Sequence, residues 1–220
     1  RNGLGLEATL SMDRCADISR LSFQGDNFGF FAYPGYVHPA YYDDTGLNFL
    51  KSFTGGFLAT CGLTTVGVPC EDEGEQLPLH GTIGNTPAEW YSFDEDDAAV
   101  TVRARVRSGR LFSEKLELRR RYTFSKSKNT VDLSDTVRNA GDVPSPLMIL
   151  YHMNMGYPLL SEKSVLHIPS ARVEPRNARA AEGLSDWMRM LPPQPCFEEQ
   201  CYFHSFDGAG RAAIFNPTIG

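Results

Sequence analysis

The sequence contains no long hydrophobic run. No stretch approaches the ~18 consecutive apolar residues that a membrane-spanning helix needs, so we expect no membrane span and no membrane partner. The N-terminal residues, Arg-Asn-Gly-Leu-Gly-Leu, lack the apolar segment of a secretory signal. These two absences favour a cytoplasmic protein.

Basic residues are also in deficit. The chain has 21 lysines and arginines against 27 aspartates and glutamates, which gives a formal net charge of −6. Proteins that bind the phosphate backbone of nucleic acids usually present a basic surface. The charge balance therefore argues against a nucleic-acid partner and fits a neutral or cationic small molecule, or no partner at all.

Cysteine is sparse, with five residues at positions 15, 61, 70, 196 and 201. An odd number without an export signal argues against a disulfide framework and for reduced thiols. Cys196 and Cys201 are separated by four residues, and neither Cys61 nor Cys70 has a neighbour at the spacing that zinc sites favour. We therefore expect no metal site.

Helix signals are scarce as well, and the best of them, residues 178–184, is interpreted as a loop turn. Instead, apolar residues recur at every second position in three consecutive segments, interrupted by Arg120 in the second and by Asp135 in the third. Alternation of this kind is typical of half-buried antiparallel strands. The rows are Ala98, Val100, Val102, Ala104 and Val106, then Leu116, Leu118, Arg120, Tyr122 and Phe124, and finally Val131, Leu133, Asp135 and Val137.

Polar breaks at 108–110 and 126–130 predict hairpin turns between these strands, and 147–151 predicts a fourth strand that is more fully buried. With 20 glycines and 14 prolines spread along the chain, the sequence predicts an all-β sandwich of two sheets with long loops. No repeat or linker divides it, so we expect a single domain over residues 1–220.

Two histidines have the most informative surroundings. His80 precedes Gly81, which allows the backbone to turn sharply beside the imidazole. His152 shares its strand phase with Asn154, so both side chains are expected on one face. A histidine near neutral pKa can donate or accept a proton at pH 7, although a single histidine on a strand is more often a satisfied structural residue.

Charged residues within otherwise apolar segments are further candidates for a functional site. They are Arg14, Asp17 and Lys51. Arg14 and Asp17 could also simply pair with each other. The sequence has no Gly-x-Ser-x-Gly elbow, phosphate loop, dinucleotide fingerprint or His-Glu-x-x-His, which excludes the corresponding hydrolase, nucleotide and zinc-protease classes.

Four segments carry a resemblance to a known family. They are Arg14-Cys-Ala-Asp-Ile18, Phe53-Thr-Gly-Gly-Phe57 continuing into Thr60-Cys-Gly-Leu63, Leu79-His-Gly81, and Leu150-Tyr-His-Met-Asn-Met-Gly-Tyr-Pro-Leu-Leu160. Over roughly residues 3 to 217 the chain resembles the aldose 1-epimerase (galactose mutarotase-like) superfamily, and within it a bacterial branch. The resemblance implies a β-supersandwich of antiparallel sheets.

The resemblance also implies a chemistry. Enzymes of this superfamily open a sugar ring with two histidines and a glutamate and reclose it as the other anomer, without a metal or organic cofactor. By motif, His152 would be the general acid and His80 a neighbouring donor. The partner would be a monosaccharide or sugar derivative, with Arg14, Asp17, Lys51 and Asn154 as candidate hydroxyl-binding residues.

The sequence departs from the family pattern at the base. The late strand with the family's glutamate is not found, and Glu199, beside Glu198, is the nearest substitute. Alternation places Glu199 and His204 on opposite faces of one strand. Both ends of the chain have the pattern of strand interiors, which would make it a fragment that lacks both ends.

Three functions therefore stay open: an anomer-converting isomerase, a non-catalytic carbohydrate-binding protein, and a phosphosugar enzyme. In the third, Arg14 and Lys51 would hold the phosphate. Neither the sugar nor the oligomeric state follows from the sequence.

Overall fold

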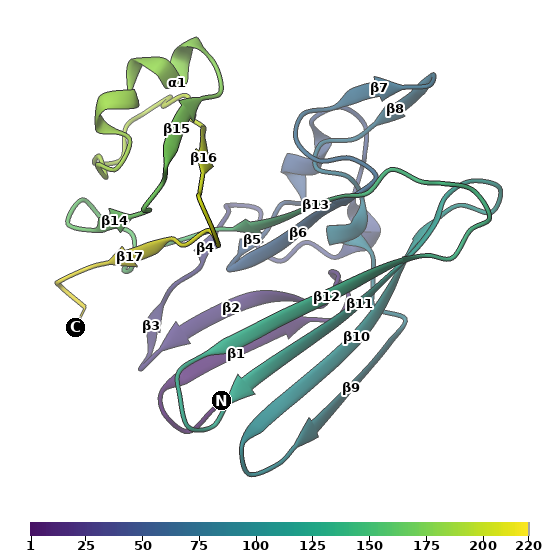
Figure 1. Cartoon of the computed structure of the whole chain (residues 1–220), viewed down its shortest axis with the longest axis horizontal. Helices are drawn as coiled ribbons and strands as arrows, with labels where there is room; N and C mark the ends of the chain where they lie inside the picture. The colour runs from purple at the N-terminus through teal and green to yellow at the C-terminus, as the bar shows by residue number, and fades with distance from the viewer. Residues whose placement is uncertain (220) are drawn as a thin grey trace. The chain divides into compact units, whose positions relative to one another are not determined.

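The structure, a computed structural model of the chain, describes residues 1–219 (Figure 1). The chain forms two compact units, Arg1–Met155 and a second unit that begins at Gly156, and each is described by itself. Every pairing between named strands in the described part is antiparallel, as the all-β prediction requires. The predicted fold class is confirmed. The single-domain assignment stays a prediction.

The first unit is built on a four-stranded sheet of order β12-β11-β10-β9 and a three-stranded sheet of order β1-β2-β3 (Figure 1). Three further strand pairs, β4-β5, β6-β13 and β7-β8, complete it. The strands are β1 (Leu6–Ser11), β2 (Asp17–Phe23), β3 (Asp26–Asn27), β4 (Phe30–Phe31), β5 (Gly55–Gly56), β6 (Leu58–Leu63), β7 (Cys70–Asp72), β8 (Glu75–Leu77), β9 (Trp90–Glu95), β10 (Ala99–Gly109), β11 (Lys115–Ser125), β12 (Val131–Asn139) and β13 (Met148–Met153).

The three alternating segments of the sequence form β10, β11 and β12, paired in that order as a meander. The turn at 126–130 lies where it was predicted, between β11 and β12. The first turn lies later than the predicted 108–110, because Ser108 and Gly109 still pair with Leu116 and Lys115. Pairing therefore extends β10 by two residues into the predicted break.

The apolar rows of these strands form one wall of the core. Tyr122 of β11 packs with Leu6, Ile18 and Leu21 of β1 and β2, and Leu58 of β6 joins the same cluster. A second cluster at the other end of the sheet joins β10 and β11 to Leu63 and Ile83, and the other residues buried in it are Cys15, Val106, Leu116 and Leu118. Two layers thus face each other across a buried core, as in a sandwich.

The fourth strand corrects the sequence prediction. β13 does not extend the meander but pairs with β6, with Tyr151 opposite Thr60 and His152 opposite Ala59. Its expected fuller burial is wrong, since Leu150 and Tyr151 are 40% and 38% exposed. The reason is topological: β13 has a strand partner on one side only and lies at the edge of a two-stranded ribbon.

The second unit contains two short strand pairs and one short helix. β14 (Val165–His167) pairs with β17 (Ala213–Phe215), and β15 (Arg172–Pro175) pairs with β16 (Tyr202–Ser205). The predicted loop turn at 178–184 contains α1 (Ala178–Glu182), a five-residue helix capped by the Asn177 side chain. Across residues 1–219, no helix has the length and apolar character needed to cross a membrane.

Candidate active site

The two predicted histidines lie together in an aromatic cluster of the first unit. The rings of His80 and His152 have centroids 5.5 Å apart and are nearly perpendicular, at 83°. Phe53 contacts His152 at 5.7 Å, Phe49 contacts His80 at 5.7 Å, and the two phenylalanines are 5.2 Å apart. The cluster presents two proton-carrying groups beside an apolar wall, which is the environment of many ligand sites.

A tight turn holds His80 in place. His80 and Gly81 both adopt left-handed backbone conformations, with φ of +60° and +70°. A Cβ at position 81 would lie 2.2 Å from the carbonyl oxygen of Gly62, so only glycine fits there. The Gly62 N–H donates to the His80 carbonyl (2.9 Å), which fastens the turn to β6. The sharp turn predicted from Gly81 is confirmed.

The tautomer of His80 follows from its neighbour. Its Nδ1 accepts a hydrogen bond from the Gly67 backbone N–H at 3.3 Å. Since the neutral ring can accept only at its unprotonated nitrogen, the proton lies on Nε2. His80 is therefore set up as an N–H donor.

His152 is positioned by β13 and by the residue at the end of that strand. The Asn154 side chain is buried, and its amide donates to the His152 carbonyl at 3.1 Å. The backbone of Asn154 is held on both sides, since its N–H donates to Phe57 and its carbonyl accepts from Phe30. Asn154 thus braces the strand end behind His152, while its predicted contact with substrate stays a prediction.

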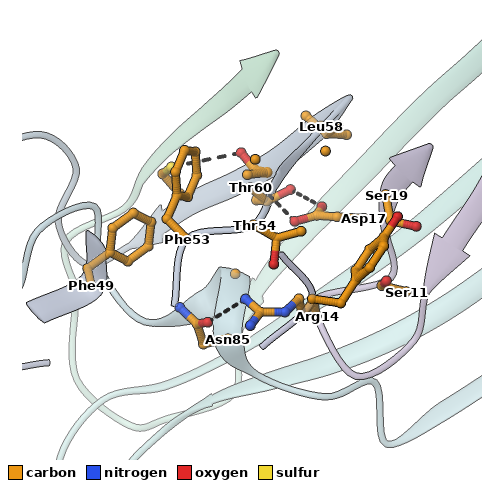
Figure 2. Close-up of a pocket in the computed structure, with 16 residues that line it drawn as sticks. Ser11, Arg14, Asp17, Ser19, Phe49, Phe53, Thr54, Leu58, Thr60 and Asn85 are labelled. Carbon is orange, nitrogen blue, oxygen red and sulfur yellow. Dashed lines mark hydrogen bonds between the residues drawn. The ribbon is translucent and has the colours of Figure 1, made fainter. Parts of the chain in front are cut away.

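Arg14 and Asp17 line a small cavity whose wall also contains Phe49 and Phe53 (Figure 2). Its volume is about 40 Å³, which has room for a few water molecules and not for a sugar ring. The Arg14 guanidinium donates to Asn85 at 2.8 Å and to the carbonyls of Val37 and Ser52. Burial lowers the pKa of Arg14, and these acceptors compensate for the lost hydration.

Asp17 pairs with Arg120 and not with Arg14. Its carboxylate accepts from Arg120 Nη1 at 2.5 Å, from the Thr60 N–H at 2.7 Å and from the Thr60 hydroxyl at 2.5 Å. A second carboxylate, Asp135 of β12, binds the other side of the guanidinium at 3.0 and 2.7 Å. Both carboxylates and Arg120 are almost fully buried, with side-chain exposures of 7%, 3% and 0%.

The backbone near Asp17 is shaped to complete this cluster. Cys15 and Ala16 have φ of +54° and +53°, a conformation that is unfavourable for residues with a Cβ. It turns the Cys15 carbonyl toward Arg120, which donates to it at 3.0 Å. Although burial alone would lower the pKa of Arg120, the hydrogen bonds to Asp135 and the nearby Asp17 carboxylate raise it well above its usual value.

The buried ion cluster anchors the ribbon that carries His152. Thr60 and Tyr151 are partners in the β6–β13 register, and both reach the cluster. The Thr60 hydroxyl accepts from Arg120 at 2.8 Å, and the Tyr151 hydroxyl donates to Asp135 at 3.1 Å. Sequence reasoning missed this role, although Arg120 and Asp135 stood as charges in otherwise apolar strand rows, which was the available signal.

The remaining predicted residues lie elsewhere. Lys51 ends the short helix η2 (Asn48–Lys51), is exposed, and does not line the cavity beside Arg14. Glu199 belongs to the second unit, is exposed, and pairs with Arg176. In the same unit, His204 bonds through Nδ1 to the Ser170 hydroxyl at 2.8 Å. The catalytic and substrate-binding roles of Lys51 and Glu199 stay predictions.

The described residues contain no set of side chains arranged as a metal site. No group of three or more histidine, cysteine, aspartate or glutamate side chains in residues 1–219 is placed to hold a metal ion. All five cysteines are free thiols, and Cys15 and Cys61 are buried. Burial raises the pKa of the Cys61 thiol to about 12, so it stays protonated at neutral pH.

The fold of this chain is similar to that of a known protein structure. The chain is similar to a crystal structure from Klebsiella pneumoniae subsp. pneumoniae described as a "putative aldose 1-epimerase", with 26% identity and a TM-score of 0.89. The alignment covers 99% of this chain and 59% of that one, so the chain spans less than two thirds of that relative. The fold is thus that of the aldose 1-epimerase-like superfamily, as the resemblance implied.

Among curated proteins, none matches the sequence. A family model does match, over residues 1–220, and its description is "Domain of unknown function (DUF4432)". Because that match covers the whole sequence, the chain belongs to the DUF4432 family.

Proposed function

We propose that this protein is an isomerase of the aldose 1-epimerase type, which interconverts the anomers of a monosaccharide or sugar derivative by acid–base ring opening. The observation that carries the proposal is the His80–His152 pair, with ring centroids 5.5 Å apart beside Phe49 and Phe53. Two imidazoles at this separation can contact the ring oxygen and a neighbouring hydroxyl of one sugar. The similar Klebsiella structure supports the same reaction class.

In the proposed reaction, His152 donates a proton to the ring oxygen while a base removes the proton of the anomeric hydroxyl. The bond between C1 and the ring oxygen breaks, and C1 becomes a carbonyl carbon. Rotation about C1–C2 and the reverse proton transfers close the ring as the other anomer. His80, with its proton on Nε2, donates a hydrogen bond to the sugar oxygen on which charge develops.

The reaction also needs a base at the anomeric hydroxyl. Glu199 is the candidate within the chain, and its carboxylate already forms an ion pair with Arg176. This pairing favours the second candidate function, a carbohydrate-binding protein that retains the histidine site without turnover. The phosphosugar alternative has less support, since the Arg14 guanidinium already binds Asn85 and two backbone carbonyls.

Anomer exchange followed by one-dimensional NMR on freshly dissolved glucose and galactose tests the proposal. The wild-type chain is expected to accelerate equilibration above the buffer rate, and His152→Gln to reduce the acceleration by about 100-fold or more because the acid is lost. His167→Gln is the matched control, since His167 is an exposed histidine of β14 in the second unit.

The outcomes separate the two candidates. Full activity in His152→Gln would falsify the assigned general acid, and equal losses in His152→Gln and His167→Gln would exclude a specific role. Saturable sugar binding with equilibration at the buffer rate would identify the non-catalytic protein instead. If Glu199 is the base, Glu199→Gln abolishes exchange while sugar binding persists.

A further inference from the structure

The outer face of the four-stranded sheet carries a lattice of arginines. On the two central strands, Arg103 lies directly opposite Arg121, and Arg105 lies directly opposite Arg119. Neighbouring strands are about 4.8 Å apart and alternate residues about 6.8 Å apart, so four long cationic side chains rise from a rectangle of that size. The protein as a whole has a net charge of −6, so this concentration of positive charge is local.

Stability does not explain this arrangement. Like charges directly opposite each other destabilise an antiparallel pair, and here two such pairs are adjacent. Carboxylates compensate only in part: Asp94 pairs with Arg103, Glu89 with Arg105, and Glu117 with Arg119. Within residues 1–219, the Arg121 side chain has no ion pair or hydrogen bond, which leaves one uncompensated cation in the lattice.

The arginines line a groove and not a flat surface. Its volume is about 540 Å³, within the range of small-ligand pockets. The strands on either side add polar and aromatic groups, with Trp90 opposite Arg105, Thr136 opposite Arg119, and Ser134 opposite Arg121. Trp90 is 48% exposed, so its ring is available to a ligand lying over the arginines.

The groove is separate from the histidine site. Arg119 and Arg121 alternate along β11 with Leu118, Arg120 and Tyr122, whose side chains are buried in the core. On the far side of that core, Tyr151 reaches inward to Asp135, and His152, the next residue of β13, faces away toward Phe53. Strand alternation therefore puts the arginines and the histidines on opposite faces of the first unit.

We propose that this groove, defined by Trp90, Arg103, Arg105, Arg119 and Arg121, binds a small phosphate ester. The planar guanidinium groups bind phosphoryl oxygens in pairs, Ser134 and Thr136 donate further hydrogen bonds, and Trp90 stacks on the ring that carries the phosphate. The phosphate replaces some of the carboxylates that now pair with these arginines. It also neutralises the positive charge that those carboxylates do not compensate.

The surroundings favour a compact ligand over a nucleic-acid backbone. Asp94 and Asp132 lie at the two edges of the next row of the sheet, opposite Thr101 and Thr123. At the other end of the groove, Glu117 occupies the central strand. A long polyanion crossing the sheet would meet these carboxylates, whereas a single phosphate ester lies between them.

Isothermal calorimetry at low and at physiological ionic strength tests the site, with inorganic phosphate, glucose 6-phosphate and adenosine monophosphate as probes. Glucose and sodium chloride at matched ionic strength control for the sugar and for the salt. We expect saturable binding of one or both esters, stronger than that of inorganic phosphate. The preferred ester then distinguishes a sugar ring from a base as the group on Trp90.

Variants locate the binding. The double variant Arg105→Gln/Arg121→Gln is expected to weaken ester binding at least about tenfold, while Arg172→Gln, an exposed arginine of the second unit, leaves it unchanged. Trp90→Ala is expected to weaken the esters but not inorganic phosphate. His152→Gln binds the esters normally, and the double-arginine variant keeps the wild-type rate of anomer exchange.

Three results would overturn the proposal. The first is no heat of binding beyond the chloride control. The second is unchanged ester affinity in the double-arginine variant, which would place the ligand elsewhere. The third is tighter binding of a short oligonucleotide than of either ester, with the same loss in the double variant, which would make this face a nucleic-acid surface.

Discussion

Neighbouring arginines on the two faces of β11 differ in their burial and in their ion pairing. Arg120 points inward, is fully buried, and binds two carboxylates, a threonine hydroxyl and a backbone carbonyl. Arg119 and Arg121 point outward, where one shares Glu117 and the other has no ion partner within residues 1–219. An arginine therefore acts as a structural cross-link on the inner face and remains partly unpaired on the outer face. The reason is that a buried charge must be fully paired, whereas an exposed charge can be hydrated by water.

The largest expected effect comes from removing the inward arginine. Arg120→Met leaves Asp17 and Asp135 buried without their counter-ion, and breaking a buried pair in this way costs about 3–5 kcal/mol of unfolding free energy. Urea unfolding of Arg120→Met measures the loss. The outward control, Arg121→Gln, should change the free energy by no more than about 0.5 kcal/mol. Similar losses in both variants would refute the distinction between the faces.

If Arg120→Met does not accumulate as folded protein, Asp135→Asn gives a milder test. The amide keeps the shape of the side chain and can still accept from Arg120 and Tyr151, while Asp17 retains its counter-ion. We expect a smaller loss of unfolding free energy than for Arg120→Met. A variant as stable as the wild type would show that the cluster does not hold the two layers together.

The strand meander was predictable from sequence, and the ion cluster was signalled there without being recognised. Alternation is a local property, so β10, β11 and β12 could be located from adjacent residues. Arg120 and Asp135 broke the apolar rows of two strands, and each break marked a buried charge that needs a partner. The partner Asp17 lies on β2, and only the packing of that strand onto the sheet identifies it.

The histidine pair was named from sequence but could not be assembled from it. His80 is held by a turn on β6, and His152 lies on β13, so their contact depends on the pairing of β6 with β13. That pairing joins segments far apart in the chain, and β13 was expected as an additional buried strand of the meander. Periodicity specifies which face a side chain occupies, but it does not specify the neighbouring strand.

A smaller effect on stability is expected at Tyr151, whose hydroxyl joins the β6–β13 strand pair to Asp135 of the ion cluster. Partial burial and the adjoining Asp135 carboxylate raise the pKa of Tyr151 to about 12. A raised pKa means that the folded state holds the phenol proton more tightly than the unfolded state does. The stabilisation is therefore complete below the ordinary tyrosine pKa of about 10 and is lost as the pH rises toward 12.

Tyr151→Phe tests this contribution. The variant should lose about 0.5–1.5 kcal/mol near neutral pH, the usual worth of one hydrogen bond, and the difference from wild type should shrink above pH 10. Urea unfolding at several pH values measures it, and absorbance of the phenolate should show one fewer tyrosine titrating near pH 12. A pH-independent difference would mean that Tyr151 acts through packing and not through its hydroxyl.

The smallest expected effect is a gain, and it lies on the outward face. In Arg121→Glu, the new carboxylate faces Arg103 directly across the strand pair, so an opposite-charge contact replaces a like-charge one. Cross-strand pairs of this kind are worth roughly 0.2–1 kcal/mol, and the gain should fall in high salt because the pair is exposed. Arg121→Gln removes the repulsion without adding attraction and should lie between the two in urea unfolding.

This gain in stability should coincide with a loss of binding. If the lattice exists to hold a phosphate ester, Arg121→Glu puts a negative charge where the phosphoryl group would lie and abolishes ester binding while raising the unfolding free energy. If a cluster of like charges destabilises the fold but is needed to bind a ligand, removing one charge should raise the stability and lower the affinity. A variant that is more stable and binds the esters as well as the wild type would instead make Arg121 an ordinary surface residue, and the difference between the two faces of β11 would then concern packing alone.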